Sequence, residues 1–223
     1  MTSVLLGSAR SSYGHPEKGD QNGKEVSTQG FYLPSQGYWL GYKFKNNLLG
    51  VKLGRAMLDA CNNNYIGYSQ PYRITGRQAY CKYGSISGIK ENCSVDCSSL
   101  VNLCLLSIGV SLPNFNTASE PKVLRNSGLF DEVKITKAEQ CTTGMILCTP
   151  TKGHTMIVIT ALTTEKPNTS AQTQTNKKTN EQIAKEVIQG KWGNGNARKC
   201  KIEKAGYNYE EIRALVNKMM KGK

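Results

Sequence analysis

The stretch Asp96-Cys-Ser-Ser-Leu-Val-Asn-Leu-Cys-Leu-Leu-Ser-Ile-Gly109 gives the clearest indication of how this chain folds. Asp96 stands at an N-cap position, where a carboxylate accepts hydrogen bonds from free backbone N–H groups, and Gly109 is a typical helix stop. Between them, apolar residues recur at the spacing of one helical face: Leu100, Val101, Cys104, Leu105 and Ile108. The sequence therefore predicts an amphipathic helix that begins at Cys97.

The segments on either side of this helix indicate an α+β domain. A capping box, Thr117-Ala-Ser-Glu120, opens one further expected helix, and the turn Thr-Pro-Thr-Lys-Gly joins two expected strands. Helices that come first and strands that come last favour the α+β class. Helices are expected over 48–61 and 117–126, and strands over 145–148 and 154–159.

A change of composition divides the chain into three parts. Residues 165–178 are rich in Thr, Asn and Gln and lack large apolar side chains, which is typical of a flexible linker. Residues 1–164 precede this linker as the main domain. Residues 179–223 follow it as a small three-helix domain, with helices expected over 180–189, 197–204 and 209–220.

Charge and hydropathy restrict the possible partners. The chain has 223 residues and a net charge of +13, which favours a polyanionic partner such as nucleic acid, an anionic membrane or a bacterial wall. Nucleic acid is disfavoured because the aromatic residues do not interleave with a basic stripe. No apolar run approaches the ~18 residues of a membrane span. The start of the chain lacks the basic and apolar regions of a signal peptide, so we expect synthesis in a cytoplasm and release by another factor.

Cysteine and histidine are the residues most able to carry chemistry. There are eight cysteines but only two histidines, His15 and His154. Cys97 stands at the first position of the predicted helix, where the helix dipole favours a thiolate. His154 opens the last predicted strand, so Cys97 and His154 are a candidate nucleophile and base. A zinc site is a weaker alternative, because its ligands would be loosely spaced: Cys93, Cys97, Cys141, Cys148 and His154.

These residues lie in motifs that resemble a known enzyme family. Asp96-Cys-Ser-Ser-Leu100, Gly144-Met-Ile-Leu147 and Gly153-His-Thr-Met-Ile-Val-Ile159 are similar to the NlpC-type and CHAP-type cysteine peptidases and amidases. The resemblance implies a papain-like domain with a small antiparallel sheet, which cuts the peptide part of peptidoglycan. It also implies that Cys97 is the nucleophile and His154 the base.

The third polar residue of that family has no clear counterpart in this chain. It normally lies on the strand after the histidine strand, but here the linker begins within about ten residues of His154. Asp20 is our first candidate for the group that orients His154, together with Gln21, and Glu165 and His15 follow.

The C-terminal part resembles the Cpl-seven-type cell-wall-binding repeat of phage lysins. The matching residues are Ile183-Ala-x-Glu-Val187, Gly190-Lys-Trp-Gly-Asn-Gly195, Arg198-Lys199 and Ala205-Gly-Tyr207. The resemblance implies a three-helix bundle that binds peptidoglycan through Trp192, Asn194 and Arg198. Trp192 could equally be the core residue of so small a domain.

Together these features predict a phage endolysin that acts on the wall of a Gram-positive bacterium. We expect it to be made without a signal peptide, to depend on a holin-type release partner, and to need no cofactor or metal. Whether it is an endopeptidase or an N-acetylmuramoyl-L-alanine amidase stays open. The alternatives are a virion-associated hydrolase, a non-catalytic cell-wall-binding protein and an acyltransferase on the same scaffold.

Overall fold

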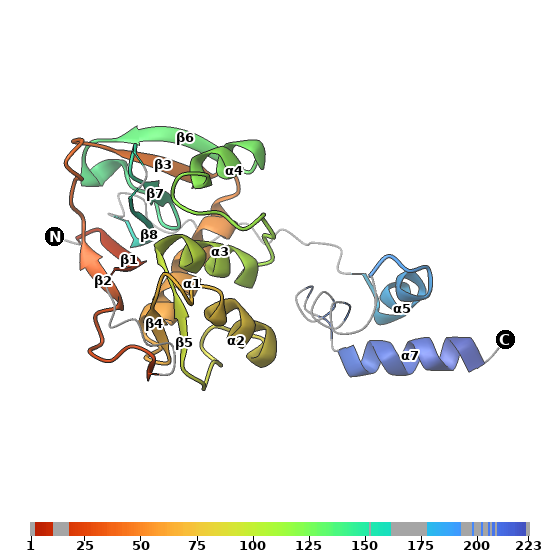
Figure 1. Cartoon of the computed structure of the whole chain (residues 1–223). Coiled ribbons are helices and arrows are strands. Elements are labelled where there is room, and N and C mark those ends of the chain that lie inside the picture. The colour runs from red at the N-terminus through yellow and green to blue at the C-terminus, as the bar shows by residue number, and fades with distance from the viewer. Residues whose placement is uncertain are drawn as a thin grey trace. The chain divides into compact units, whose positions relative to one another are not determined.

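The computed structural model divides the chain into two compact units, Met1–Thr164 and Glu165–Lys223, called here the first unit and the second unit. The residues that the structure describes are 3–10, 18–151, 153–161, 178–192, 198, 202, 205, 207 and 209–221. Of the expected linker, only Lys178 lies among them. Each unit is drawn in Figure 1 and is described here by itself.

The first unit is built on an antiparallel sheet (Figure 1). Within the described residues this sheet has six strands in the order β2-β1-β8-β7-β3-β6, and every neighbouring pair is antiparallel. The strands are β1 (Leu5–Ala9), β2 (Val26–Gly30), β3 (Trp39–Phe44), β6 (Phe130–Ile135), β7 (Ile146–Cys148) and β8 (Thr155–Thr160). The two strands expected from the sequence are therefore β7 and β8, at the centre of a larger sheet.

Helices and a second, smaller sheet accompany the main sheet. A short parallel pair joins β4 (Ile66–Tyr68) to β5 (Cys93–Val95). The helical elements are α1 (Asn47–Cys61), α2 (Thr75–Tyr83), α3 (Cys97–Ser107), α4 (Glu120–Asn126) and the 3-10 turn η2 (Ala138–Gln140). This arrangement confirms a mixed helix-and-strand domain with an antiparallel sheet.

The sheet is buried on both faces because successive residues of its strands point to opposite sides. Ile146, Cys148 and Ile157 belong to one apolar cluster, which also contains the inner residues of α1 and α3. Leu147, Met156 and Val158 belong to a second cluster on the other face, with Trp39 and Met145. Helix α3, which begins at Cys97, and strand β8, which directly follows His154, thus both pack into the first of these clusters.

Helix α3 begins at Cys97, as the sequence predicts. The Asp96 carboxylate accepts a hydrogen bond from the Ser99 backbone N–H at 2.7 Å, and the Ser99 hydroxyl accepts one from the Asp96 N–H at 2.8 Å. Such a reciprocal cap satisfies two donors that a helix terminus otherwise leaves free. Beyond the helix, Gly109 has a φ of +88°, a left-handed conformation that glycine adopts without strain.

The expected capping box before α4 is wrong in its detail. The helix begins at Glu120 itself, Ser119 occupies the cap position, and no side chain makes the capping hydrogen bond. The Glu120 side chain is fully buried instead. Local sequence favoured a solvent-exposed cap, but the packing of α4 on the sheet turns this carboxyl group inward.

The second unit has a core of its own. Within its described residues it contains α5 (Asn180–Ile188), capped by Thr179, and α7 (Tyr209–Lys221). Of the third helix expected over 197–204, the structure describes only Arg198 and Ile202, both helical. The buried apolar residues are Ile183, Ala184, Val187, Ile202, Ile212 and Val216.

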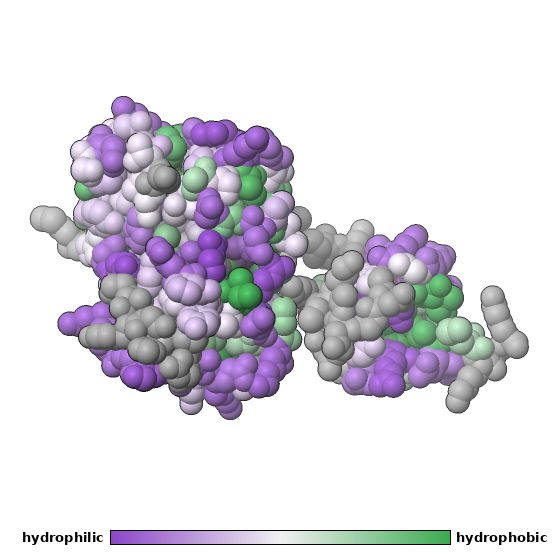
Figure 2. Space-filling model, viewed as in Figure 1, coloured by the Kyte–Doolittle hydropathy of each residue, from purple (hydrophilic) through white to green (hydrophobic). Residues whose placement is uncertain are grey.

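The surface of the first unit is mostly hydrophilic and interrupted by small apolar patches (Figure 2). Among the helices that the structure describes, none is both long enough and apolar enough to cross a membrane.

Candidate active site around Cys97

Cys97 lies where helix α3 meets the start of strand β8. Its side chain is buried, with 8% of the residue exposed. The backbone N–H groups of Ser98 and Thr155 face its sulfur and favour the thiolate. Because Thr155 directly follows His154, the fold brings the predicted nucleophile to the segment that carries the predicted base.

Burial outweighs the helix terminus in setting the protonation of Cys97. Desolvation raises the pKa of the Cys97 thiol to about 11, and the neighbouring Asp96 carboxylate adds to the rise. The sequence suggested a lowered pKa from the helix dipole, and that expectation is wrong for this state of the site. At neutral pH the Cys97 side chain is therefore a thiol.

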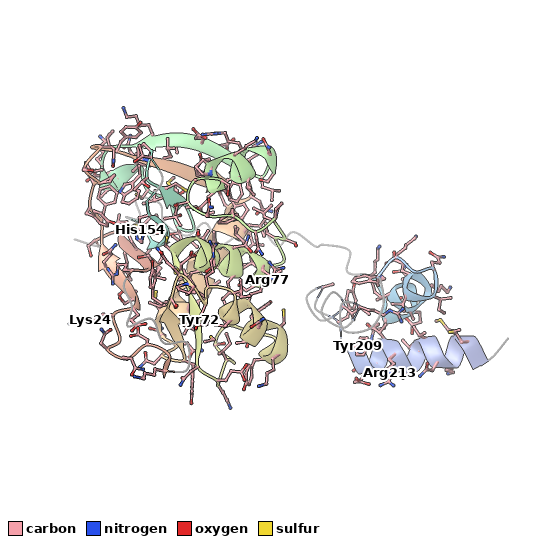
Figure 3. The ribbon with its side chains drawn as sticks, in the orientation of Figure 1. Lys24, Tyr72, Arg77, His154, Tyr209 and Arg213 are labelled. Carbon is pink, nitrogen blue, oxygen red and sulfur yellow. The ribbon has the colours of Figure 1, made fainter. Side chains whose placement is uncertain are left out.

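His154 is half-buried and neutral at physiological pH. Desolvation lowers the pKa of its imidazole to about 4, and the positive charge of Arg10 lowers it further. Its backbone is held by Thr149, whose hydroxyl accepts a hydrogen bond from the His154 N–H at 3.1 Å. Figure 3 shows His154 beside the sheet, at the approach to β8. In the described part of the chain, no hydrogen bond joins the side chains of Cys97 and His154.

Asp20 holds a loop together. One oxygen of its carboxylate accepts hydrogen bonds from the N–H groups of Asn22 and Lys24, and the other accepts from Glu25 and Val26, at 3.1–3.3 Å. Lys24 lies apart from His154 in Figure 3. His154 is not among the hydrogen-bond partners of Asp20 in the region that the structure covers, so the orienting role stays a prediction.

The other candidates for the third polar residue give no partner for His154 either. The Gln21 side chain donates to the carbonyl of Lys18. Glu165 and His15 lie outside the described residues.

Glu120 is a buried acid next to the site that the sequence pattern did not reveal. One of its oxygens accepts a hydrogen bond from the Thr155 hydroxyl at 3.0 Å, and the other has no partner among the described residues. Burial raises the pKa of this carboxyl group to about 8, so it is largely protonated at neutral pH. Glu120 thereby holds Thr155, the residue that follows His154 and whose backbone N–H faces the Cys97 sulfur.

Arg73 is a second residue that sequence reasoning missed. Its guanidinium forms an ion pair with Asp96 at 3.1 Å and donates to the Ser98 hydroxyl at 3.1 Å. Both partners flank Cys97 in the sequence. Nothing in the spacing around Arg73 signals this role, because the contact depends on how α2 packs against α3.

The zinc alternative finds no ligand set in the described part of the chain, where no group of three His, Cys, Asp or Glu side chains could hold a metal ion. Cys200 lies outside the described residues. The other six cysteines are free thiols, and four of them are buried: Cys93, Cys104, Cys141 and Cys148, with Cys61 half-buried and Cys81 exposed.

In the second unit, the predicted wall contacts differ in what they touch. Trp192 is half-buried against the apolar core and donates from its indole N–H to Glu186 at 3.1 Å. The core role of this side chain is thus evident, and one ring edge is already engaged. Arg198 is helical and half-buried, and Asn194 lies outside the described residues.

Comparison with known families agrees with this division. The family model described as the endolysin-like domain matches residues 9–165, and the CW_7 repeat matches residues 181–220. No curated protein and no solved structure matches the chain. The first match spans more than half of the chain, and the two together indicate an endolysin that acts on peptidoglycan. The chain belongs to the endolysin-like domain family and carries a CW_7 repeat in its second unit.

Proposed function

We propose that this chain is a peptidoglycan hydrolase whose first unit cleaves an amide bond in the peptide part of the wall by Cys–His catalysis. The observation that carries the proposal is the meeting of the Cys97 sulfur with the segment that follows His154. A cysteine at the start of a buried helix, packed against a strand that directly follows the histidine, is the arrangement expected of a papain-like NlpC-type or CHAP-type domain.

Both groups of the proposed pair are neutral at pH 7, a thiol and an imidazole, so the thiol needs a general base to become the nucleophile. The imidazole of His154 is neutral at pH 7, so it can accept the Cys97 proton as the sulfur attacks the amide carbonyl. His154 then returns this proton to the leaving amine, and an acyl-thioester on Cys97 remains. Water, deprotonated by His154, hydrolyses the thioester and regenerates the thiol.

The second unit supplies affinity for the wall in this proposal. Its CW_7 repeat and the basic charge of the chain favour binding to an anionic Gram-positive wall. Arg198, Asn194 and the free face of Trp192 are the proposed contacts. A holin-type partner is the proposed route of release.

Mass spectrometry of digested peptidoglycan tests this function and separates its variants. Purified Gram-positive wall is incubated with the intact protein, and the soluble products are analysed. An endopeptidase adds one water within the peptide, whereas an amidase adds it between the lactyl group and the first residue. An acyltransferase forms a new amide without gaining water. A wall that stays unchanged, with the protein bound to it, would leave only the non-catalytic binding function.

A further inference from the structure

A polar pocket lies beside the start of helix α3, on the side formed by α2. Its volume is about 290 Å³, and Ser99, two residues after Cys97, forms part of its wall. Arg73 also forms part of this wall, and its guanidinium contacts Asp96 and Ser98, the two residues that flank Cys97, each at 3.1 Å. Figure 3 shows Arg77 on this side of the unit. The pocket is thus a neighbour of the proposed nucleophile rather than a remote cavity.

The pocket contains two arginines whose charges are used differently. Arg73 is neutralised by its ion pair with Asp96 at 3.1 Å. Arg77 donates only from Nη1, to the amide oxygens of Asn102 at 3.4 Å and Asn114 at 3.1 Å. Among the described residues no carboxylate forms an ion pair with Arg77. The pocket therefore carries an excess of one positive charge.

Arg77 is held in place while most of its donors remain available. A guanidinium has five N–H donors in a planar fork, which matches a carboxylate in a bidentate way. The two amide partners fix the fork without neutralising it, so little side-chain freedom remains to be lost on binding. Ile74 and Phe115 provide apolar wall next to the charge. A volume at the lower end of ligand pockets suits one amino-acid residue of a larger ligand.

We propose that this pocket is a subsite that binds a carboxylate of the peptide being cleaved, with Arg77 as its anion-binding residue. The proposal rests on the proposed function, since the stem peptides of peptidoglycan bear carboxylates that are either free or amidated. The pocket then makes the enzyme prefer stem peptides with a free carboxylate at the bound position. Arg77 is a specificity residue, and it takes no part in proton transfer.

Paired soluble substrates test the subsite. One is a stem peptide with free carboxylates, and the other is the same peptide with these groups converted to primary amides. We expect the intact protein to show a KM about ten- to a hundredfold lower for the free form, as charge-assisted hydrogen bonds of this kind allow. Arg77→Gln should remove that preference by raising the KM of the free form towards that of the amidated form, and Arg77→Lys should restore part of it.

Two controls keep the result decisive. Arg55→Gln makes the same change at an exposed arginine that does not line the pocket, and it should leave the preference intact. Cys97→Ser protein allows the dissociation constants of both peptides to be measured by calorimetry without turnover. Equal binding of the two peptides, or a preference that survives in Arg77→Gln, would overturn the subsite. A free-carboxylate preference in binding, with no cleavage by the intact protein, would refute the hydrolase function and leave the subsite standing.

Discussion

The two units of this chain treat the same side chain, glutamate, in opposite ways. In the first unit Glu120 is fully buried, and burial raises its pKa to about 8. In the second unit the pKa of Glu181 is lowered by backbone and Thr179 hydrogen bonds at the start of α5. The pKa of Glu186 is lowered as well, by Lys178 and Trp192. Burial thus favours the neutral form of Glu120, whereas hydrogen bonds and a neighbouring lysine favour the charged forms of Glu181 and Glu186.

The difference follows from the size of the core. Six strands and several helices enclose enough apolar volume to desolvate Cys97, Glu120 and the imidazole of His154. The few apolar residues of the second unit pack α5 against α7, and charged side chains such as Glu181 and Lys185 stay exposed. In the first unit burial keeps the Cys97 thiol and the His154 imidazole neutral at pH 7, whereas adhesion to a charged wall needs exposed charge. This contrast fits the proposed division between cleavage by the first unit and adhesion by the second.

The largest expected effect is the loss of lysis in Cys97→Ser. A hydroxyl is a far weaker nucleophile than a thiol in a site built for cysteine, so turnover should fall at least ~1000-fold. Turbidity of a Gram-positive cell suspension measures this, and sedimentation with purified wall should show unchanged binding by the second unit. Cys81→Ser, at an exposed cysteine, is the matched control and should lyse normally. Lysis by Cys97→Ser at the native rate would mean that chemistry resides elsewhere.

Glu120→Gln should stabilise the first unit, increasingly so as pH rises. The pKa of Glu120 in the folded state lies above its ordinary value of 4.5. The contribution of Glu120 to the free energy of unfolding is therefore fully present below pH 4.5 and is lost as pH rises towards 8. Gln keeps an acceptor for Thr155 and has no charge to bury. The gain should reach a few kcal/mol, since one pKa unit corresponds to about 1.4 kcal/mol.

Urea unfolding at pH 4.5 and pH 8 measures this gain. Glu139→Gln makes the same change at an exposed position and should show no such pH dependence. A gain that is equal at the two pH values would show that Glu120 titrates normally and would weaken the contrast between the units.

Removal of residues 179–223 should separate adhesion from chemistry. The first unit keeps its whole core in that variant, so we expect unchanged cleavage of soluble muropeptides. Lysis of intact cells should slow by about tenfold, because the loss of one of two linked binding elements lowers the local concentration at the wall. Soluble and cell-bound substrates are assayed side by side. An equal loss on both would indicate that the second unit also supports the site.

The smallest expected effect concerns Glu186. Glu186→Gln removes the ion pair with Lys178 while an acceptor for the Trp192 indole remains. The Lys178 side chain of this pair is exposed to solvent, so the second unit should lose only a small part of its stability. Thermal unfolding followed by circular dichroism measures it, with Glu181→Gln as a neighbouring control. A loss of stability as large as that caused by a core substitution would show that Glu186 behaves as a buried acid like Glu120. The contrast between the glutamates of the two units would then be wrong.

Much of the local structure was predictable from the sequence. The helix expected over 48–61 is α1, Asn47–Cys61, and the helices expected over 180–189 and 209–220 correspond to α5 and α7. The outer strands of the sheet were not foreseen. β1 pairs with β8, although β1 lies near the start of the first unit's sequence and β8 near its end. β3 and β6, which also pair, are likewise far apart in the sequence. Such pairing depends on distant partners, so a polar, glycine-rich start gives no sign of it.

The sequence by itself determined where the proposed nucleophile stands: Asp96, Ser99 and the apolar stripe start a helix at Cys97 through contacts within a few residues. Only the tertiary structure decided the chemical state of that residue and the neighbours of the site. Glu120 reaches Thr155, and Arg73 reaches Asp96, from other elements of the fold. The physical reason is that capping and periodicity are local, whereas desolvation and ion pairing depend on what the rest of the chain packs around a group.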